Sequence, residues 1–216
     1  FPPEMVSRDR RNFPTYAPST AEHKPDINCF KSWMPELNDA LSERFQRPFF
    51  IANEGLGGHT AGMYLDVLRH DRLLQQRLRQ LRPDYYLIHL GVNDERYEVP
   101  AAQFESDLNA IIDILIKEYQ AKPEAILIAF PSYDRHPNAA RFYPGYRAAI
   151  DRIVKTRGVC QGPDFNAAYA ENTTKYYGAD PVHPNPGPGM RKMAELWTEA
   201  VAAAIVRNES GNTGGK

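Results

Sequence analysis

The sequence is short of features that would direct the protein to a membrane or to nucleic acid. No apolar run approaches the roughly 20 residues that a membrane-spanning helix needs. The 26 Lys and Arg residues are matched by 27 Asp and Glu, so the net charge is −1, and no Lys/Arg run with interleaved aromatic residues occurs. Such a chain has no overall positive electrostatic potential that would attract nucleic acid or an anionic membrane. With only two cysteines, Cys29 and Cys160, a single disulfide and two free thiols both stay open.

What is present is the composition of an ordinary globular protein. Hydrophobic residues make up 42% and charged residues 25% of 216 residues, which is enough for a core. No internal repeat or domain boundary is evident, so we expect a single domain over residues 1–207 and a disordered polar tail over residues 208–216. The tripeptides that begin at Asn172 and Asn208 match the N-glycosylation acceptor pattern. They favour a secreted protein, but such tripeptides also arise by chance, and the localisation stays open.

Hydrophobic residues recur at two periods along the chain. Spacings of three and four residues predict helices over residues 28–45, 61–81, 101–120, 139–157 and 188–206. Short continuous apolar runs predict buried strands over Phe49–Ala52, over Tyr85–Leu90, within residues 124–134 and over Gly158–Gln161. The first 26 residues hold five prolines and predict an irregular segment. Alternating helices and buried strands are typical of an α/β fold with a parallel sheet covered on both faces, where reactive groups gather at the carboxyl ends of the strands.

Glycines crowd the turn that follows the first predicted strand. Asn53 leaves the strand, and Gly55, Gly57 and Gly58 follow it. Glycine permits positive φ and a close approach of a ligand to the main chain, and an exposed N–H group there can stabilise an oxyanion. A plain strand-to-helix turn and a glycine-lined phosphate site are the alternatives. The dinucleotide fingerprint G-x-G-x-x-G is not met, because the third glycine falls at Gly58, and the P-loop lysine is absent.

Polar side chains also stand at the turn after the next strand. Gly91 ends that strand, and Asn93 and Asp94 follow. The Asn93 amide can donate a hydrogen bond into a cleft. Alternatively, Asn93 or Asp94 simply caps the following helix.

An aspartate and a histidine precede the last predicted helix. Asp180 and His183 lie on one irregular segment that Pro181 and Pro184 stiffen. A carboxylate can orient an imidazole and stabilise its charged form, which leaves the other ring nitrogen as a general base. A turn with a surface histidine and a metal site are the alternatives, although no second group of ligands completes a coordination shell. The single histidines elsewhere are expected to be surface or packing residues: His59, His89 and His136.

Taken together and in this order, the three turns resemble those of the SGNH hydrolase family, also called GDSL esterases and lipases. The family's N-x-G-x-x-G corresponds to Asn53–Gly58, its G-x-N-D to Gly91–Asp94 and its D-x-x-H to Asp180–His183, and the resemblance covers about residues 28–207. It implies a flavodoxin-like three-layer α/β/α sandwich with a parallel sheet. It also implies that the Gly58 N–H and the Asn93 side chain are oxyanion donors, that His183 is the base, and that Asp180 orients it. The resemblance implies no cofactor and no metal ion.

The family's nucleophile is the serine of a Gly-Asp-Ser sequence at the end of its first strand, and that sequence does not occur here. We expect the strand to exist outside residues 1–216, as a short N-terminal fragment or as a further segment of the protein. A parallel sheet without this central strand would leave buried backbone groups unpaired, at ~1–3 kcal/mol each. One alternative is an internal serine, for which Ser7 and Ser19 qualify by position, because Ser32 and Ser42 fall in a predicted helix. The other is a non-catalytic relative.

The expected function is that of a serine hydrolase acting on a carboxylic ester through an acyl-enzyme. The substrate is expected to be a short acyl or acetyl ester, on a carbohydrate or a lipid. Two other functions stay open: an O-acyltransferase that uses the same site, and a carbohydrate- or partner-binding module on a degenerate scaffold. Aromatic residues within Ser132–Tyr146 either line the acyl pocket or belong to a surface loop.

Overall fold

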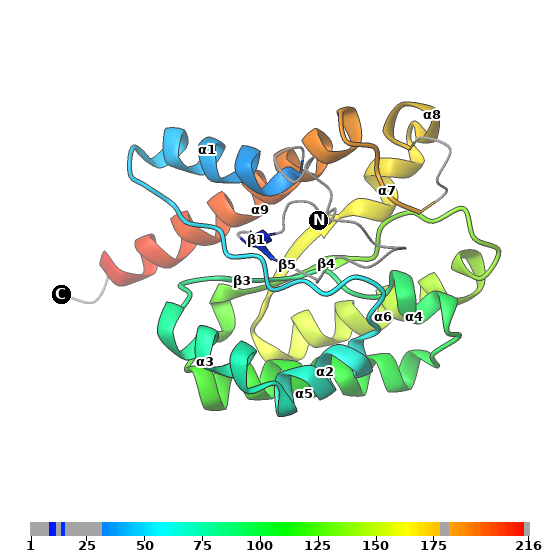
Figure 1. Ribbon diagram of the computed structural model, residues 1–216, viewed down its shortest axis with the longest axis horizontal. Helices are drawn as coiled ribbons and strands as arrows, with labels where there is room; N and C mark the ends of the chain where they lie inside the picture. Colours follow the sequence, from blue (N-terminus) through cyan, green and yellow to red (C-terminus); the bar gives the residue numbers. More distant parts are fainter. Residues whose placement is uncertain (1–8, 12–13, 16–31, 178–181, 214–216) are drawn as a thin grey trace. The chain divides into compact units, whose positions relative to one another are not determined.

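The computed structural model of the protein, whose helices and strands Figure 1 labels, divides into two compact units. The described residues are 9–11, 14–15, 32–177 and 182–213. Unit 1 comprises Phe1–Gly57 and Thr174–Thr198, and unit 2 comprises Gly58–Thr173 and Glu199–Lys216. The long C-terminal helix continues from one unit into the other.

Unit 2 is built on a three-stranded parallel sheet with the strand order β3-β4-β5. Its strands are β3 (Tyr86–Ile88), β4 (Ile126–Phe130) and β5 (Cys160–Asp164). Tyr86 pairs with Ile126, and Leu127 pairs with Cys160. All five residues of β4 are buried, as expected for a central strand covered on both faces. The parallel α/β fold predicted from the alternating pattern is therefore confirmed.

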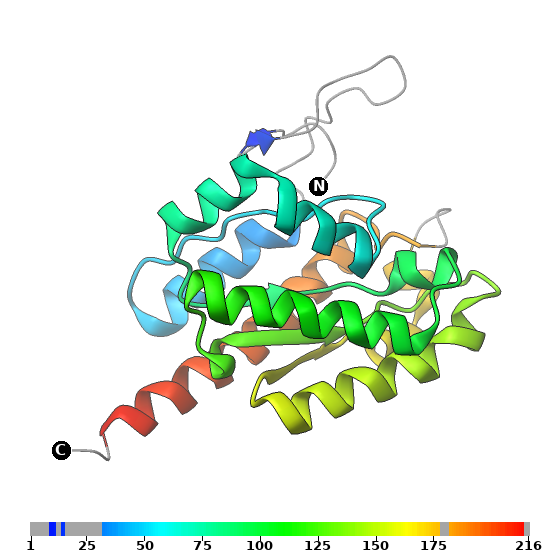
Figure 2. The same cartoon turned by 90° about the horizontal axis from the view of Figure 1, so that it is seen from below.

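The helices of unit 2 pack on its sheet or on one another. They are α2 (Ala61–His70), α3 (Arg72–Leu81), α4 (Val92–Arg96), α5 (Ala101–Tyr119), α6 (Ala139–Arg157) and α7 (Phe165–Ala170), with a 3-10 turn, η3, over Pro123–Ala125. Helices α5 and α6 run side by side, as Figure 2 shows. Their buried stripes meet where the rings of Phe104 and Tyr146 lie 4.4 Å apart between centroids. Both rings are completely buried, so this contact lies in the core of unit 2.

Unit 1 contains α1 (Trp33–Phe45) and the first part of α9 (Pro188–Thr213). The stacked rings of Trp33 and Trp197 join the two helices at a centroid distance of 6.2 Å. The short helix α8 (Thr173–Tyr176) precedes the turn into α9. A short antiparallel pair, β1 (Asp9–Arg11) and β2 (Pro14–Thr15), lies in the segment that was expected to be irregular.

The strand predicted over Phe49–Ala52 is wrong. These residues form no strand, and Phe50 is 80% exposed. The Phe49 N–H donates to the Ser42 hydroxyl at 3.1 Å instead of to a neighbouring strand. A strand persists only where another strand satisfies its backbone groups, and no strand in the described part of the chain pairs with this segment.

Two predicted helix boundaries also differ from the structure. The helix predicted over 61–81 is two helices, because the Asp71 side chain accepts hydrogen bonds from Leu73 N (2.8 Å) and Leu74 N (3.0 Å) and so caps α3. At the other end of the chain, α9 extends to Thr213 rather than ending near Val206. Asn208, beyond the predicted end, donates to the Tyr85 hydroxyl and to the Glu124 carbonyl, each at 3.3 Å.

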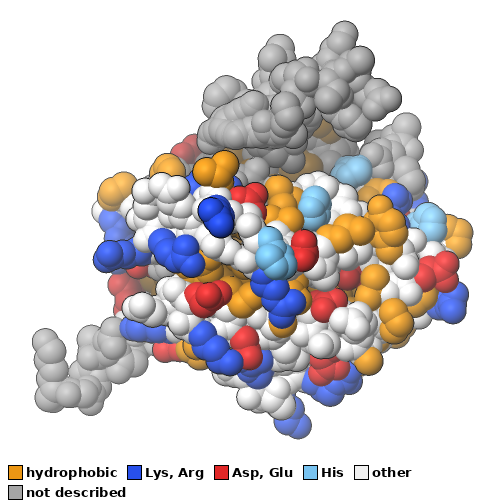
Figure 3. Space-filling model, turned by 60° about the horizontal axis from the view of Figure 1, so that its bottom comes forward, with side chains coloured by type: hydrophobic (Ala, Val, Ile, Leu, Met, Phe, Trp, Pro, Cys, Tyr) orange, Lys and Arg blue, Asp and Glu red, His pale blue; other side chains and the backbone are white. Residues whose placement is uncertain are grey.

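The surface carries both signs of charge. Figure 3 shows a face on which Lys and Arg are interspersed with Asp, Glu and hydrophobic side chains, in agreement with the net charge of −1. None of the helices in the described ranges has the length and the hydropathy that a membrane crossing requires.

Candidate active site

Within unit 2, the turn after β3 is bonded directly to the residues that follow Gly58. The Asn93 side-chain N–H donates to the His59 carbonyl at 3.1 Å. The Asp94 carboxylate accepts the Ala61 N–H with both oxygens, at 3.0 and 3.1 Å. Asp94 therefore caps α2 from a distant part of the chain, at the positive end of that helix dipole. Neither Asn93 nor Asp94 caps its own helix α4, whose N-cap is Gly91.

Two hydrogen-bond donors of these turns have no partner in the described part of the chain. Gly58 is exposed, has a positive φ of 76°, and directs its N–H to no described acceptor. A carboxamide carries two N–H groups, and the bond to His59 uses one of those on Asn93. These donors are the amide N–H of Gly58 and a second carboxamide N–H of Asn93, and Asn93 is hydrogen-bonded to His59, the residue that follows Gly58.

Gly91 has to be a glycine for two separate reasons. Its φ is +120°, a conformation that side chains strongly disfavour, and a Cβ atom there would overlap the Pro131 ring. We expect Gly91→Ala to reduce the free energy of unfolding by about 3 kcal/mol, since it combines backbone strain with overpacking.

Urea denaturation measures this effect, and Gly57→Ala is the matched control. A Cβ at Gly57 meets no atom of the described residues within 4 Å and its φ is not positive, so the control should stay within about 0.5 kcal/mol of the wild type. Equal losses in the two variants would contradict the assigned role of Gly91.

The sequence did not single out a serine–histidine contact that lies at the carboxyl ends of β3 and β4. Ser132 is only 4% exposed, and its hydroxyl lies 3.2 Å from His89 Nε2. The His89 ring packs against Phe165 at 4.6 Å, and burial lowers the pKa of this histidine to about 4. The imidazole is therefore neutral, and no described carboxylate contacts it. The pair suits packing, as expected for His89, better than proton transfer. The only available signal was the position of Ser132 after a buried strand.

Buried carboxyl groups lie on α4 and next to it. Glu95 is 1% exposed and neither of its carboxylate oxygens has a hydrogen-bond partner. Burial, with further contributions from Asp134 and Asp94, raises its pKa to about 8. Burial also raises the pKa of Asp94 to about 6, although the Ala61 N–H opposes this shift. Asp134 is buried as well and forms an ion pair with Arg96 at 3.3 Å. Nothing in the sequence pattern distinguished Glu95 from a solvent-exposed helical glutamate.

His183 belongs to unit 1, where its side chain is exposed, and Asp180 lies outside the described residues. The turn that carries His183 is organised by Asn185. The side-chain oxygen of Asn185 accepts the N–H groups of Gly187 (3.2 Å) and Gly189 (3.0 Å), and its side-chain nitrogen donates to the Lys175 carbonyl (2.8 Å). Asn185 is thus a structural residue that the sequence analysis missed, although asparagine before Pro-Gly is a turn signal.

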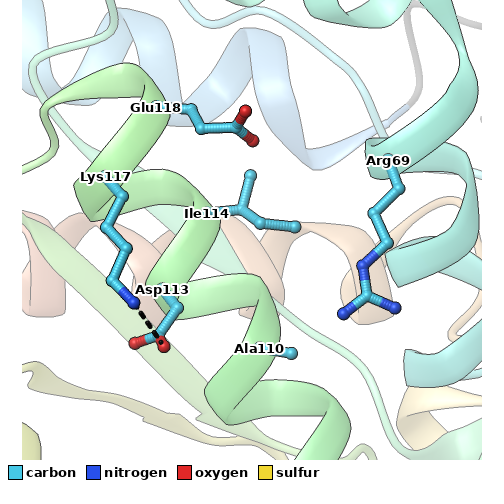
Figure 4. A pocket seen from close by; sticks show the side chains of 6 residues that line it. All are labelled: Arg69, Ala110, Asp113, Ile114, Lys117 and Glu118. Carbon is cyan, nitrogen blue, oxygen red and sulfur yellow. Dashed lines mark hydrogen bonds and ion pairs between the residues drawn. The ribbon is translucent and has the colours of Figure 1, made fainter.

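One shallow hollow lies away from these turns, on the helical face of unit 2. It is lined by Arg69 of α2 and by residues of α5, namely Ala110, Asp113, Ile114, Lys117 and Glu118 (Figure 4). Lys117 and Asp113 form an ion pair at 3.2 Å within it. No predicted site residue lines this hollow. Among the described residues, no group of three or more His, Cys, Asp or Glu side chains is placed to hold a metal ion.

Comparison with known proteins accounts for the three motifs together. The sequence profile of the GDSL-like lipase/acylhydrolase family matches residues 17–187, a range that includes all three. A search of the curated proteins found no match.

Solved structures of esterases share the fold. The psychrotrophic esterase EstA from Pseudoalteromonas sp. superposes with a TM-score of 0.60 at 20% identity, over 83% of this chain and 88% of that chain. A mutant of Axe2, an acetyl-xylooligosaccharide esterase from Geobacillus, gives 0.62 at 20% identity, over 79% and 80%. The acetyl xylan esterase AlAXEase gives 0.59 at 18% identity, over 80% and 91%. At these identities the likeness establishes the fold, and it confirms the SGNH hydrolase architecture that the motifs implied.

Proposed function

Because the chain belongs to the GDSL-like lipase/acylhydrolase family, we propose that it hydrolyses a carboxylic ester through an acyl-enzyme. The proposed substrate is a short acyl or acetyl ester, on a carbohydrate or a lipid. The observation that carries this proposal is the hydrogen bond from Asn93 to the His59 carbonyl, at 3.1 Å. It fixes Asn93 to the residue that follows Gly58, and this supports the proposal because oxyanion donors must be held in fixed positions.

Each motif residue then has one role. His183 accepts the proton of the nucleophilic serine as its oxygen attacks the ester carbonyl, and Asp180 orients the imidazole. The Gly58 N–H and the Asn93 carboxamide stabilise the negative charge on the tetrahedral intermediate. The intermediate collapses to an acyl-enzyme, and His183 passes its proton to the departing alcohol. Water deprotonated by His183 then attacks the acyl-enzyme, which releases the carboxylic acid and restores the serine.

The nucleophile is proposed to lie on a strand that pairs with the outer edge of β3. On one side, Tyr86, Leu87 and Ile88 pair with β4. On the other side, these residues have no backbone partner within the described ranges. A strand carrying Gly-Asp-Ser, supplied by a segment or fragment outside residues 1–216, would satisfy this edge and place the serine at the carboxyl end of the sheet.

Ser132 is the internal rival for this role. Its histidine neighbour has a pKa lowered to about 4 by burial, so His89 is a weak base. Within the described residues, that ring also lacks a carboxylate to stabilise its charged form. Ser7 and Ser19, the other internal possibilities, lie outside the described residues.

A fluorophosphonate probe tests both the reaction and the nucleophile. We expect the native protein to hydrolyse p-nitrophenyl acetate, to lose this activity on labelling, and to carry the label on a serine peptide absent from residues 1–216. Mass spectrometry of the denatured, digested protein identifies the peptide. Label on Ser132, Ser7 or Ser19 would support the hydrolase function but would show that the nucleophile lies within residues 1–216. Saturable binding of a carbohydrate with neither turnover nor labelling would replace the enzyme by a binding module.

A further inference from the structure

Helix α4, which carries Asn93, is held in place by the chain that follows β4. Asp134 accepts a hydrogen bond from Arg96 at 3.3 Å, and the Asn138 side chain donates to the Glu95 carbonyl at 3.3 Å. A third hydrogen bond joins the chain just after α4 to α6: the Tyr146 hydroxyl donates to the Val99 carbonyl at 2.6 Å. The position of Asn93 therefore depends on the interface between α4 and residues 131–146.

The Glu95 side chain is buried in this interface without a hydrogen-bond partner. Three charged groups face it: Asp94 and Arg96 from its own helix, and Asp134 from the segment after β4. Tyr146 of α6 also lies close enough for its pKa to be raised by Glu95. An ionised Glu95 would face the carboxylates of Asp134 and Asp94, and the arginine that opposes this charge, Arg96, is already paired with Asp134. A buried charge without compensation is far costlier than a neutral carboxylic acid in the same place.

We propose that Glu95 is a positioning residue, whose uncharged carboxyl group allows α4 to pack against residues 131–146 and so holds Asn93 in place for the reaction. This inference rests on the role proposed above for Asn93. Loss of the proton places three carboxylates in one buried interface, which loosens α4 and withdraws the Asn93 donor.

The ionisation of Glu95 falls in an accessible range. Burial, Asp134 and Asp94 raise its pKa to about 8, so the neutral form dominates at neutral pH. Asp94, with a pKa of about 6, is ionised on both sides of that transition. The pKa of Tyr146 is raised above its ordinary value of 10, mainly by burial, so this hydroxyl keeps its proton. Glu95 is thus the facing group whose charge changes near pH 8.

Glu95→Gln is the direct test, because glutamine has nearly the same shape and cannot ionise. In the wild-type protein we expect kcat for p-nitrophenyl acetate to fall about tenfold between pH 7 and pH 9 as Glu95 loses its proton. In the Gln variant we expect a flat profile over this range. Glu98→Gln is the matched control, since Glu98 is exposed and paired with Arg141 at 3.0 Å. It should reproduce the wild-type fall.

Hydrogen exchange of the peptide covering Val92–Arg96 provides a readout that does not depend on catalysis. Corrected for the intrinsic exchange rate, its protection should drop between pH 7 and pH 9 in the wild type and in Glu98→Gln, but not in Glu95→Gln. An alkaline transition that persists in Glu95→Gln overturns the proposal. If Glu95→Gln does not fold, the wild type decides by itself: constant protection across this range overturns the proposal. If protection drops as expected but neither the wild type nor any variant hydrolyses the ester, the role of Glu95 in the packing of α4 is supported and the proposed function is refuted.

Discussion

Replacing His183 by alanine is expected to lower kcat for ester hydrolysis by about 10⁴-fold, because no other group would then accept the proton of the nucleophile. The fold should survive the change. The His183 side chain is exposed, and hydrogen bonds of Asn185 hold the turn around it. The measurement is steady-state hydrolysis of p-nitrophenyl acetate, with circular dichroism to verify folding.

His70→Ala is the matched control for this variant. His70 is an exposed histidine on α2, paired with Asp66 on the same helix at 3.0 Å. Its replacement removes an imidazole of similar exposure from a place where no proton transfer is proposed. Its kcat should stay within about twofold of the wild type, as is usual for surface substitutions away from a site. A His183→Ala enzyme with near wild-type kcat would eliminate this histidine as the base.

Asn93→Ala is expected to lower kcat by about 10² to 10³-fold while leaving KM nearly unchanged. The reason is that an oxyanion donor interacts more strongly with the tetrahedral intermediate than with the neutral ester. Its loss therefore raises the activation free energy of the chemical step and leaves the affinity for the ester nearly unchanged. The initial rates at saturating and at limiting ester concentrations separate the two parameters.

The loss of the bond to the His59 carbonyl is a side effect of this substitution and needs its own control. Asn109→Ala removes a comparable carboxamide that donates to the Glu105 carbonyl at 2.9 Å, on α5. Its kcat should remain within about twofold of the wild type. If Asn93→Ala instead raises KM at constant kcat, the side chain contributes to substrate binding and not to the transition state.

Glu95, which we propose positions Asn93, lowers the stability of the protein as the pH rises. The folded-state pKa of Glu95, about 8, lies above its ordinary value of 4.5, so its contribution to stability is complete below about pH 4.5 and is lost as the pH rises through 8. Over that window the slope is roughly 1.4 kcal/mol per pH unit for one proton. A buried acid whose pKa is raised on folding does not stabilise the protein at neutral pH. Such departures from good packing are expected where a residue serves the site rather than the core.

Local patterns were sufficient for the elements whose residues bury a continuous stripe or run. Helix α6 occupies the predicted residues 139–157, and α5 differs from its prediction by a single residue, since apolar side chains at helical spacing need only a surface to cover. Strand β4 was recognisable because all its residues are apolar and buried. The three turns were recognisable for a related reason: each combines residue types whose chemistry is specific at short spacing, and together they match one family.

Long-range pairing decided the rest. Phe49–Ala52 has the composition of a strand and is not one, because strand formation depends on a neighbour and the described chain provides none. Asn93 bonds to His59, and Asn138 bonds to the backbone of the buried Glu95. The residues of each pair are more than 30 positions apart, and no local pattern encodes such pairs. The sequence by itself determined the order of helices and strands and the chemistry of the turns. The tertiary structure alone decided which turns are joined and which charges are buried, because both depend on contacts between segments that are distant along the chain.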